Sequence, residues 1–310
     1  MQHLLPDFRI FYNHTVRPEL IRLESERLQL LQWLGGFVLL AVGVLFVQLY
    51  FDIFPLTVVL LLPLIFYLSQ CSQKIRRFKT DFKPRIVRLI LSFLEDKTSA
   101  YQHLTYHPKR SISQKKFNQS KIFYTDEISF RGEDLLAGMV GELRFEGSEL
   151  LVREPSSVRS GFKTIFRGVF FYADWGRPLY GEILVVPRAN RQYLSRSIRN
   201  FAAEGGEEVS SELRDLVFSD VFATFATSGT PVASLLSPEI RGAILQFRER
   251  AGKEIYLSFV GSTIYVGVGG SSGILEPSIF RSNISYDFVL DYFDLICLFL
   301  GVIEDFDNNN

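Results

Sequence analysis

The sequence predicts an α+β protein in which an N-terminal two-helix transmembrane hairpin precedes a cytoplasmic domain of antiparallel strands with packed helices. Two uncharged apolar stretches, residues 28–51 and 53–68, predict the hairpin. From residue 122 onward, short apolar segments alternate with glycine- and proline-containing turns, which is typical of antiparallel strands. Segments with helical spacing lie before, between and after them and indicate the packed helices.

The first apolar stretch is long enough to cross a bilayer. Residues 28–51 would extend about 36 Å as a helix, against a hydrocarbon core of about 30 Å. Residues 53–68 are shorter and contain Pro63, which helices in lipid tolerate. We expect spans over about residues 30–51 and 53–70 in a hairpin of residues 28–73, with a re-entrant second segment as the alternative.

A basic segment predicts the orientation of this hairpin. The turn between the two stretches carries Asp52 and no basic residue, so the positive-inside rule places the basic side in the cytoplasm. We expect a multi-pass protein of the cell inner (plasma) membrane with both termini cytoplasmic. The basic segment, residues 74–97, also fits recognition of anionic lipid, although an ordinary topology signal is the plainer interpretation. Its membrane-flanking basic residues are Lys74, Arg76, Arg77, Lys79, Lys83, Arg85 and Arg88.

Residues 1–27 predict a cytoplasmic helix that runs into the first span. Pro18 suits the first position of a helix. Phe8, Phe11 and Tyr12 form a short apolar face and are candidate interaction residues. The alternative is that this face packs on the protein's own domain.

Residues 98–306 predict the cytoplasmic α+β domain, followed by a tail at 307–310. Its strands are expected in hairpins, with helices on one face. The expected strand segments are those around 143–145 and 150–152, divided at Gly141 and Gly147; 165–172 and 179–186, paired around a turn at 174–178; 217–226; and 255–260 with 263–268. The expected helices are 113–117, 189–201, 238–250 with Ser237 as the N-cap, and 287–305 as a core helix, with an exposed loop at 204–208.

The chain resembles an uncharacterised bacterial membrane-protein family, domain of unknown function 3137. The resemblance is carried by Asp7-Phe8-Arg9, Arg17-Pro18-Glu19-Leu20, Gly132-Glu133-Asp134, Phe166-Arg167-Gly168-Val169-Phe170-Phe171, the hairpin from Trp175 to Gly181, Ser237-Pro238-Glu239 and Ile255-Tyr256-Leu257-Ser258-Phe259. It implies the same two-helix anchor and cytoplasmic domain, and assigns no catalytic residue. It also implies envelope-associated assembly beside a LemA-type membrane protein. Trp175-Gly176 stands where the family pattern leads us to expect Phe-Asn or a similar pair.

No residue set points clearly to catalysis, a metal or a cofactor. His103 and His107 are four residues apart but lack a third ligand nearby, so surface histidines are the plainer interpretation. Glu133 and Asp134 could offer carboxylates to a pocket, although paired acids after a glycine more often belong to a turn. Residues 267–273 are glycine-rich, with Gly267, Gly269 and Gly270 as candidate pocket residues, but neither a lysine nor an evident helix follows to complete a phosphate cradle.

These patterns favour a membrane-anchored interaction or scaffold protein over an enzyme. The 34 basic and 34 acidic side chains balance, which argues against nucleic-acid binding. The expected partners are the lipid bilayer and a protein partner or a second copy of the chain, with no cofactor. The alternative is a membrane-associated enzyme or ligand receptor whose pocket lies near Glu133, Asp134 and residues 267–273.

Overall fold

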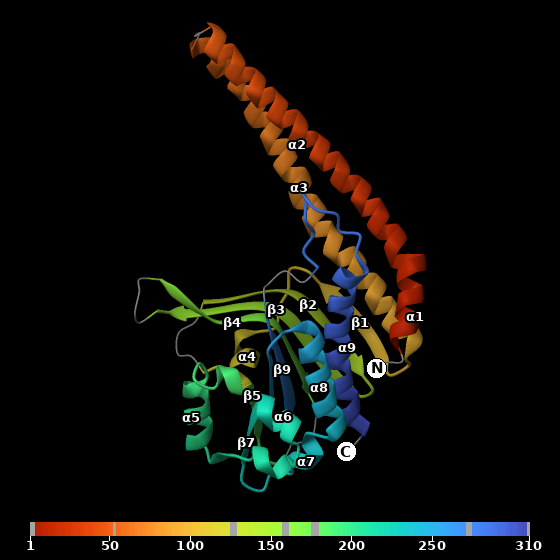
Figure 1. Ribbon diagram of the computed structural model, residues 1–310, viewed down its shortest axis with the longest axis vertical. Helices are drawn as coiled ribbons and strands as arrows, with labels where there is room; N and C mark the ends of the chain where they lie inside the picture. Colours follow the sequence, from red (N-terminus) through yellow and green to blue (C-terminus); the bar gives the residue numbers. More distant parts are fainter. Residues whose placement is uncertain are drawn as a thin grey trace. The chain divides into compact units, whose positions relative to one another are not determined.

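The computed structural model describes residues 4–51, 54–124, 129–156, 161–174, 180–270 and 275–308. They divide into two compact units (Figure 1). The helical unit comprises residues 2–90 and 275–290, and the sheet unit comprises residues 91–274 and 291–310.

The helical unit begins with one continuous helical segment. It consists of α1 (Leu4–Phe11), a π-helical turn η1 (Tyr12–Val16) and α2 (Arg17–Phe51). The prediction that Pro18 begins a helix is wrong, because helix precedes it from Leu4. Proline has no N–H to donate and crowds the preceding turn. The turn directly before Pro18 is the wider π-helical turn η1, in which the Arg17 N–H donates to the Tyr12 carbonyl. This wider turn accommodates the proline within a continuous helix.

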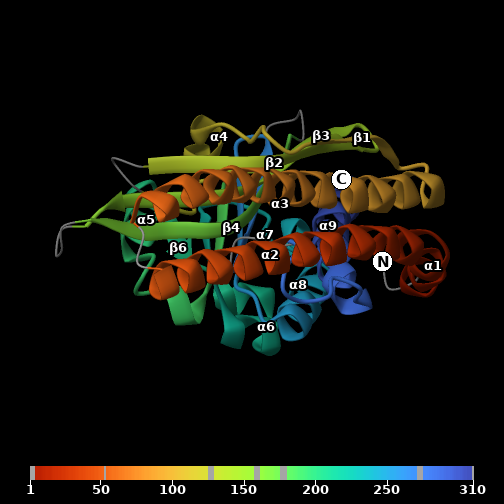
Figure 2. The same ribbon diagram turned by 90° about the horizontal axis from the view of Figure 1, so that it is seen from above.

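Helix α3 (Phe54–Lys97) lies antiparallel beside α2 (Figures 1 and 2). The Tyr67 ring stacks on Trp33 with ring centroids 5.2 Å apart, and its hydroxyl donates to the Trp33 carbonyl at 3.1 Å. Pro63 and Pro84 both lie inside α3. The second apolar stretch and the basic segment therefore form one uninterrupted helix.

The sheet unit is built on one antiparallel sheet of nine strands among the described residues. Its order is β1-β2-β3-β4-β9-β8-β5-β7-β6, and every neighbouring pair is antiparallel. The predicted α+β class is confirmed. The strands are β1 (Tyr101–His107), β2 (Ser129–Val140), β3 (Leu143–Pro155), β4 (Phe162–Asp174), β5 (Ile183–Pro187), β6 (Gly206–Glu208), β7 (Phe222–Thr227), β8 (Ile255–Val260) and β9 (Thr263–Gly269). The helices are α4 (Gln114–Gln119), α5 (Ser195–Ala203), α6 (Leu216–Val221), α7 (Val232–Leu235), α8 (Pro238–Ala251) and α9 (Tyr286–Asn308), with 3₁₀ turns η2 (Arg188–Asn190) and η3 (Ser210–Leu213).

The prediction that 165–172 and 179–186 pair as a hairpin is wrong. β4 pairs with β3 and β9, whereas β5 pairs with β7 and β8. The β8–β9 hairpin, which is predicted correctly, lies between β4 and β5. All five residues of β5 are buried, as suits a strand whose two faces are both covered. The turn expected at 174–178 lies, beyond Asp174, outside the described residues.

Four local predictions also need correction. β1 and β2 are missing from the predicted strands, and Glu133 and Asp134, expected at a turn, lie within β2. Gly147 lies within β3 rather than at a turn. A Cβ at this position would come within 1.9 Å of the Phe171 ring. The predicted strand at 217–226 starts as helix α6, because the Asp215 side chain accepts a hydrogen bond from the Phe218 N–H and caps it. The loop at 204–208 contains the short edge strand β6.

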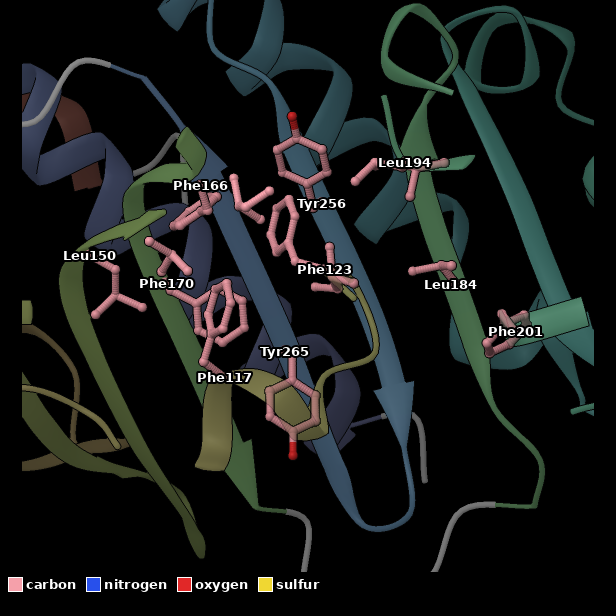
Figure 3. Close-up of a cluster of buried hydrophobic side chains, with 14 of the residues drawn as sticks. Phe117, Phe123, Leu150, Phe166, Phe170, Leu184, Leu194, Phe201, Tyr256 and Tyr265 are labelled. Carbon is pink, nitrogen blue, oxygen red and sulfur yellow. The ribbon is translucent and has the colours of Figure 1, made fainter. Parts of the chain in front are cut away.

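Aromatic side chains cover both faces of the sheet, so the expectation of helices on one face is wrong. On one face, Phe117 of α4 and Phe201 of α5 join the buried cluster with Phe166 and Phe170 of β4 (Figure 3). On the other face, Phe299 of α9 stacks on Phe171 with ring centroids 4.3 Å apart. Adjacent residues of β4 thus point to opposite cores, as the alternation of a strand requires.

Helix α8 begins at the predicted cap. The Ile240 N–H donates to the Ser237 Oγ at 3.1 Å, and Pro238 takes the first helical position. Ser237→Ala is expected to lower the free energy of unfolding by about 1 kcal/mol, because it leaves a helix N–H unsatisfied. Thermal unfolding followed by circular dichroism measures the effect. Ser234→Ala, at an exposed serine of the preceding α7, is the matched control and should change little.

A buried carboxylate on α9 gives the sheet unit a pH-dependent stability. Burial raises the pKa of Asp294 to about 6, although Arg250 opposes the rise from 2.9 Å. Its ordinary pKa is 3.8. The folded state therefore holds the proton more tightly than the unfolded chain, and this group lowers the free energy of unfolding as pH rises between those two values.

Asp294→Asn is expected to remove this loss of stability with rising pH. The melting temperature of the variant relative to the natural chain should rise from about pH 4 to about pH 6 and stay level above that. The control Asp220→Asn changes an exposed carboxylate on α6 in the same unit. Parallel pH profiles for the natural chain and Asp294→Asn would contradict the assignment.

Candidate functional site

The apolar helices α2 and α3 present side chains that nothing in the described structure covers. Both are long and apolar enough to cross a membrane, and very few side chains in the most apolar stretch of each helix are buried. Leu39 is 75% exposed, Leu49 84% and Phe66 66%. A folded soluble protein buries such side chains or gathers them at an interaction surface.

An aromatic and a cation mark one end of this apolar surface. The Lys74 ammonium lies 3.3 Å from the centroid of the Trp33 ring. Tryptophan and lysine both favour the boundary between hydrocarbon and water. This pair therefore defines the level at which α2 and α3 change from apolar to charged composition.

The predicted basic residues on α3 fall into two groups. Arg76, Arg77, Lys79 and Arg88 are exposed. The others are engaged or buried: Lys74 lies on Trp33, Lys83 is buried, and Arg85 lies 3.3 Å from Glu26 and 3.8 Å from Glu19. The exposed group is the part of the flank that remains accessible to anions.

The predicted N-terminal aromatic face packs within the helical unit. Phe8 and Tyr12 are buried, and their rings lie 6.3 Å and 5.0 Å from that of Tyr286. Burial raises the pKa of Tyr12. Phe11 is partly exposed, and Ile10 beside it is 60% exposed. Two of the three candidate interaction residues, Phe8 of α1 and Tyr12 of η1, thus pack against the start of α9.

The two halves of the predicted pocket are not brought together. Glu133 and Asp134 lie at an irregularity of β2, where Tyr106 of β1 donates its hydroxyl to Asp134. Burial and the neighbouring Asp134 carboxylate raise the pKa of Tyr106. Gly267, Gly269 and Gly270 lie along and just after β9, and both β3 and β4 stand between β2 and β9.

A cavity of about 420 Å³ adjoins the glycine half of that pocket. Gly269, Gly270, Lys253, Glu254 and Tyr256 line it, together with β4 residues 164–167. Tyr193, also in its lining, donates its hydroxyl to the carbonyls of residues 164 and 165 at 2.8 and 2.6 Å. Sequence reasoning missed Tyr193, because a lone tyrosine after a helical turn carries no motif.

The chemistry-bearing residues otherwise form no recognisable catalytic set. No group of three or more His, Cys, Asp or Glu side chains that could hold a metal occurs in the described ranges. His103 and His107 lie on β1 rather than on a helix, so their spacing separates their backbones by roughly 13 Å. Cys71 and Cys297 are buried free thiols, and burial raises the pKa of Cys297.

The fold and these surfaces define an α+β protein with two apolar helices that could cross a membrane. Residues 164–308 match the family model described as a protein of unknown function (DUF3137), which confirms the predicted resemblance to this family over those residues. The match runs from β4 to the end of α9 and leaves out α2 and α3. Neither the curated proteins nor the solved structures contain a match to this chain.

Proposed function

We propose that this protein is a membrane-anchored interaction protein that crosses the bilayer twice, through α2 and α3, and carries its sheet unit in the cytoplasm. The observation that supports it best is the exposure of the apolar side chains on both helices, exemplified by Leu39 and Leu49. Apolar side chains at the centre of a span each favour lipid by about 0.3–0.6 kcal/mol, so the many on each helix outweigh Gln48 and the glycines of α2.

The proposed orientation follows from the charges that flank the helices. The exposed cations Arg76, Arg77, Lys79 and Arg88 follow the second span. The positive-inside rule assigns the side of the bilayer that carries them to the cytoplasm. Alkaline phosphatase, which is active only outside the cytoplasm, tests this when fused after Asn310. We expect no activity from that fusion and activity from a truncated fusion made after Asp52. Activity of the Asn310 fusion would contradict the orientation.

The interaction role concerns the sheet unit. Leu216 and Val217 are adjacent on α6 and are 81% and 67% exposed, so this unit carries apolar surface outside its core. The partner would be another protein or a second copy of the chain at the bilayer surface. The family resemblance makes a LemA-type membrane protein the first candidate to examine.

Crosslinking in cells, followed by extraction in mild detergent and mass spectrometry, tests this role. We expect a defined complex that survives purification. One control is the uncrosslinked chain. The other is the double variant Leu216→Ser, Val217→Ser, which removes the exposed apolar pair on α6. Recovery of a bare monomer at every dose of crosslinker would count against an interaction role.

Small-molecule binding is the second candidate, favoured by the cavity beside Tyr193. Gly270→Leu should fill part of this cavity, since a Cβ there meets no atom closer than the Lys253 side chain at 3.6 Å. Native mass spectrometry of the purified chain would support this candidate if a bound compound is present and is lost in Gly270→Leu. A compound retained by the variant would exclude this cavity as its site.

A further inference from the structure

The segment that precedes α9 forms a closed turn in the helical unit. The Ser278 N–H donates to the Asn283 Oδ1 at 2.8 Å, and the Asn283 Nδ2 donates back to the Ser278 carbonyl at 2.9 Å. The Arg281 N–H donates to the Ser278 Oγ at 3.1 Å. Asn283 is itself buried. The backbone of residues 278–283, which we call the 278–283 turn, is thus fixed by its own hydrogen bonds.

A buried ion pair attaches this turn to α2. The Arg27 Nη1 donates to the Ile279 carbonyl at 2.8 Å, and the Arg27 Nη2 lies 2.6 Å from the Glu24 Oε1. The Asn283 N–H donates to Glu24 at 3.4 Å. The hydrogen bond from Arg27 lowers the pKa of Glu24, which therefore stays ionised at neutral pH. The turn is held one residue before the uncharged stretch of α2 begins at Leu28.

The turn presents an aromatic and a cation side by side to its surroundings. Phe280 is 80% exposed, and Arg281 next to it is also exposed. In contrast, the neighbouring Ile279 is buried. A phenylalanine this exposed on a fixed turn contributes nothing to the folded core. Because the turn is already ordered, burying this ring on a partner would cost little conformational entropy.

The position of the turn along α2 indicates that the partner is the surface of the bilayer. Trp33 lies six residues beyond Arg27, about 9 Å along the helix axis, and Lys74 lies on its ring. The polar layers on the two sides of a bilayer each add about 5–7 Å to the hydrocarbon core. Arg27 therefore lies about 2–4 Å beyond that layer, a distance that the side chains of Phe280 and Arg281 can span toward the lipid headgroups. Figure 1 shows the segment, in blue, beside α2 and α3 of the helical unit.

We propose that the 278–283 turn is a second, peripheral membrane contact of this protein. Phe280 enters the interfacial layer of the bilayer that α2 and α3 span, and Arg281 binds a lipid phosphate there. This contact rests on the proposed transmembrane anchor. The turn would attach the segment that leads into α9 to the bilayer surface, in addition to the attachment that the two spans provide.

Quenching of tryptophan fluorescence by brominated lipids tests the contact. The test chain carries Phe280→Trp, with Trp33→Phe and Trp175→Phe to leave one tryptophan, and is reconstituted into vesicles of phosphatidylcholine and phosphatidylglycerol brominated on the acyl chains. A chain that keeps Trp33 alone reports the anchor. A chain with Ile10→Trp alone is the matched control, since Ile10 is exposed but roughly 25 Å before Arg27 along the helix.

We expect quenching and a blue-shifted emission for Trp33 and for Phe280→Trp, with neither for Ile10→Trp. Adding Arg281→Gln should weaken the quenching of Phe280→Trp. If Trp33 is quenched and Phe280→Trp is not, the turn contact is wrong and the anchor stands. If Trp33 itself is not quenched, the anchor fails and the turn contact fails with it.

Discussion

Arginines at Leu39, Val42, Leu62 and Ile65 together are expected to remove the protein from the carbonate-resistant membrane fraction. All four side chains are exposed, two on α2 and two on α3. Each arginine near the centre of a span costs about 2.5–3.5 kcal/mol, so four should outweigh the apolar gain of both helices. Sedimentation after an alkaline carbonate wash, with immunoblotting of pellet and supernatant, measures the effect.

The matched control places four arginines at exposed apolar residues outside the two apolar stretches. Ile10, Ile21, Leu216 and Val217 are each more than half exposed. Their replacement should leave the protein in the pellet, because none of them enters hydrocarbon in the proposed topology. Equal sedimentation of both variants would mean that the apolar surfaces of α2 and α3 do not hold the protein in the membrane.

Phe117→Ala is expected to destabilise the sheet unit severely. Phe117 is fully buried, and its ring lies 5.0 Å from Phe170, 5.5 Å from Phe123 and 5.9 Å from Phe166 (Figure 3). Truncating a buried phenylalanine costs about 3–5 kcal/mol through lost burial and the cavity left behind. That corresponds to a fall in melting temperature of roughly 10 °C for a unit of this size.

Near-ultraviolet circular dichroism of the full chain in detergent follows this loss through the aromatic signals. The control is Phe162→Ala, which removes a ring of the same size from a position that is 62% exposed at the start of β4. The control should lie within about 0.5 kcal/mol of the natural chain. A similar melting temperature for both variants would show that the Phe117 cluster does not stabilise the sheet unit.

Local patterns predict the elements of this chain well. The uncharged stretches identify α2 and the first part of α3, because a helix in lipid needs a long apolar sequence. Ser237-Pro238 identifies the first turn of α8, since capping depends on adjacent residues. Gly261-Ser262 identifies the β8–β9 hairpin in the same way. In each case the determining interaction lies within a few residues of the element.

Pairing over long distances in the chain is where prediction fails. One of the two partners of β4 is β9, about a hundred residues later, and no feature of either strand specifies this pairing. β1 escapes prediction because an edge strand needs few apolar residues, and those buried in it are chiefly Tyr101 and Tyr106. The start of the 217–226 segment reads as strand because Val217 and Phe218 are apolar, while the cap at Asp215 decides for helix.

The same contrast holds for the candidate sites. The basic flank is visible in the sequence because it is contiguous, but the structure is needed to separate exposed Arg76 from buried Lys83. The 278–283 turn offers a weaker signal, the short run Ile279-Phe280-Arg281 between two serines. Its attachment to Arg27 spans 252 positions of the chain and could not be read from the sequence.

The measurement that tests the central claim most directly is the accessibility of a spin label at Leu39. The label is attached to Leu39→Cys after Cys71→Ser and Cys297→Ala remove the natural thiols, and the chain is placed in lipid vesicles. In lipid, apolar oxygen should relax the label strongly and a water-soluble nickel complex should relax it weakly. Strong relaxation by the nickel complex, with weak relaxation by oxygen, would place Leu39 in water and contradict the proposed anchor.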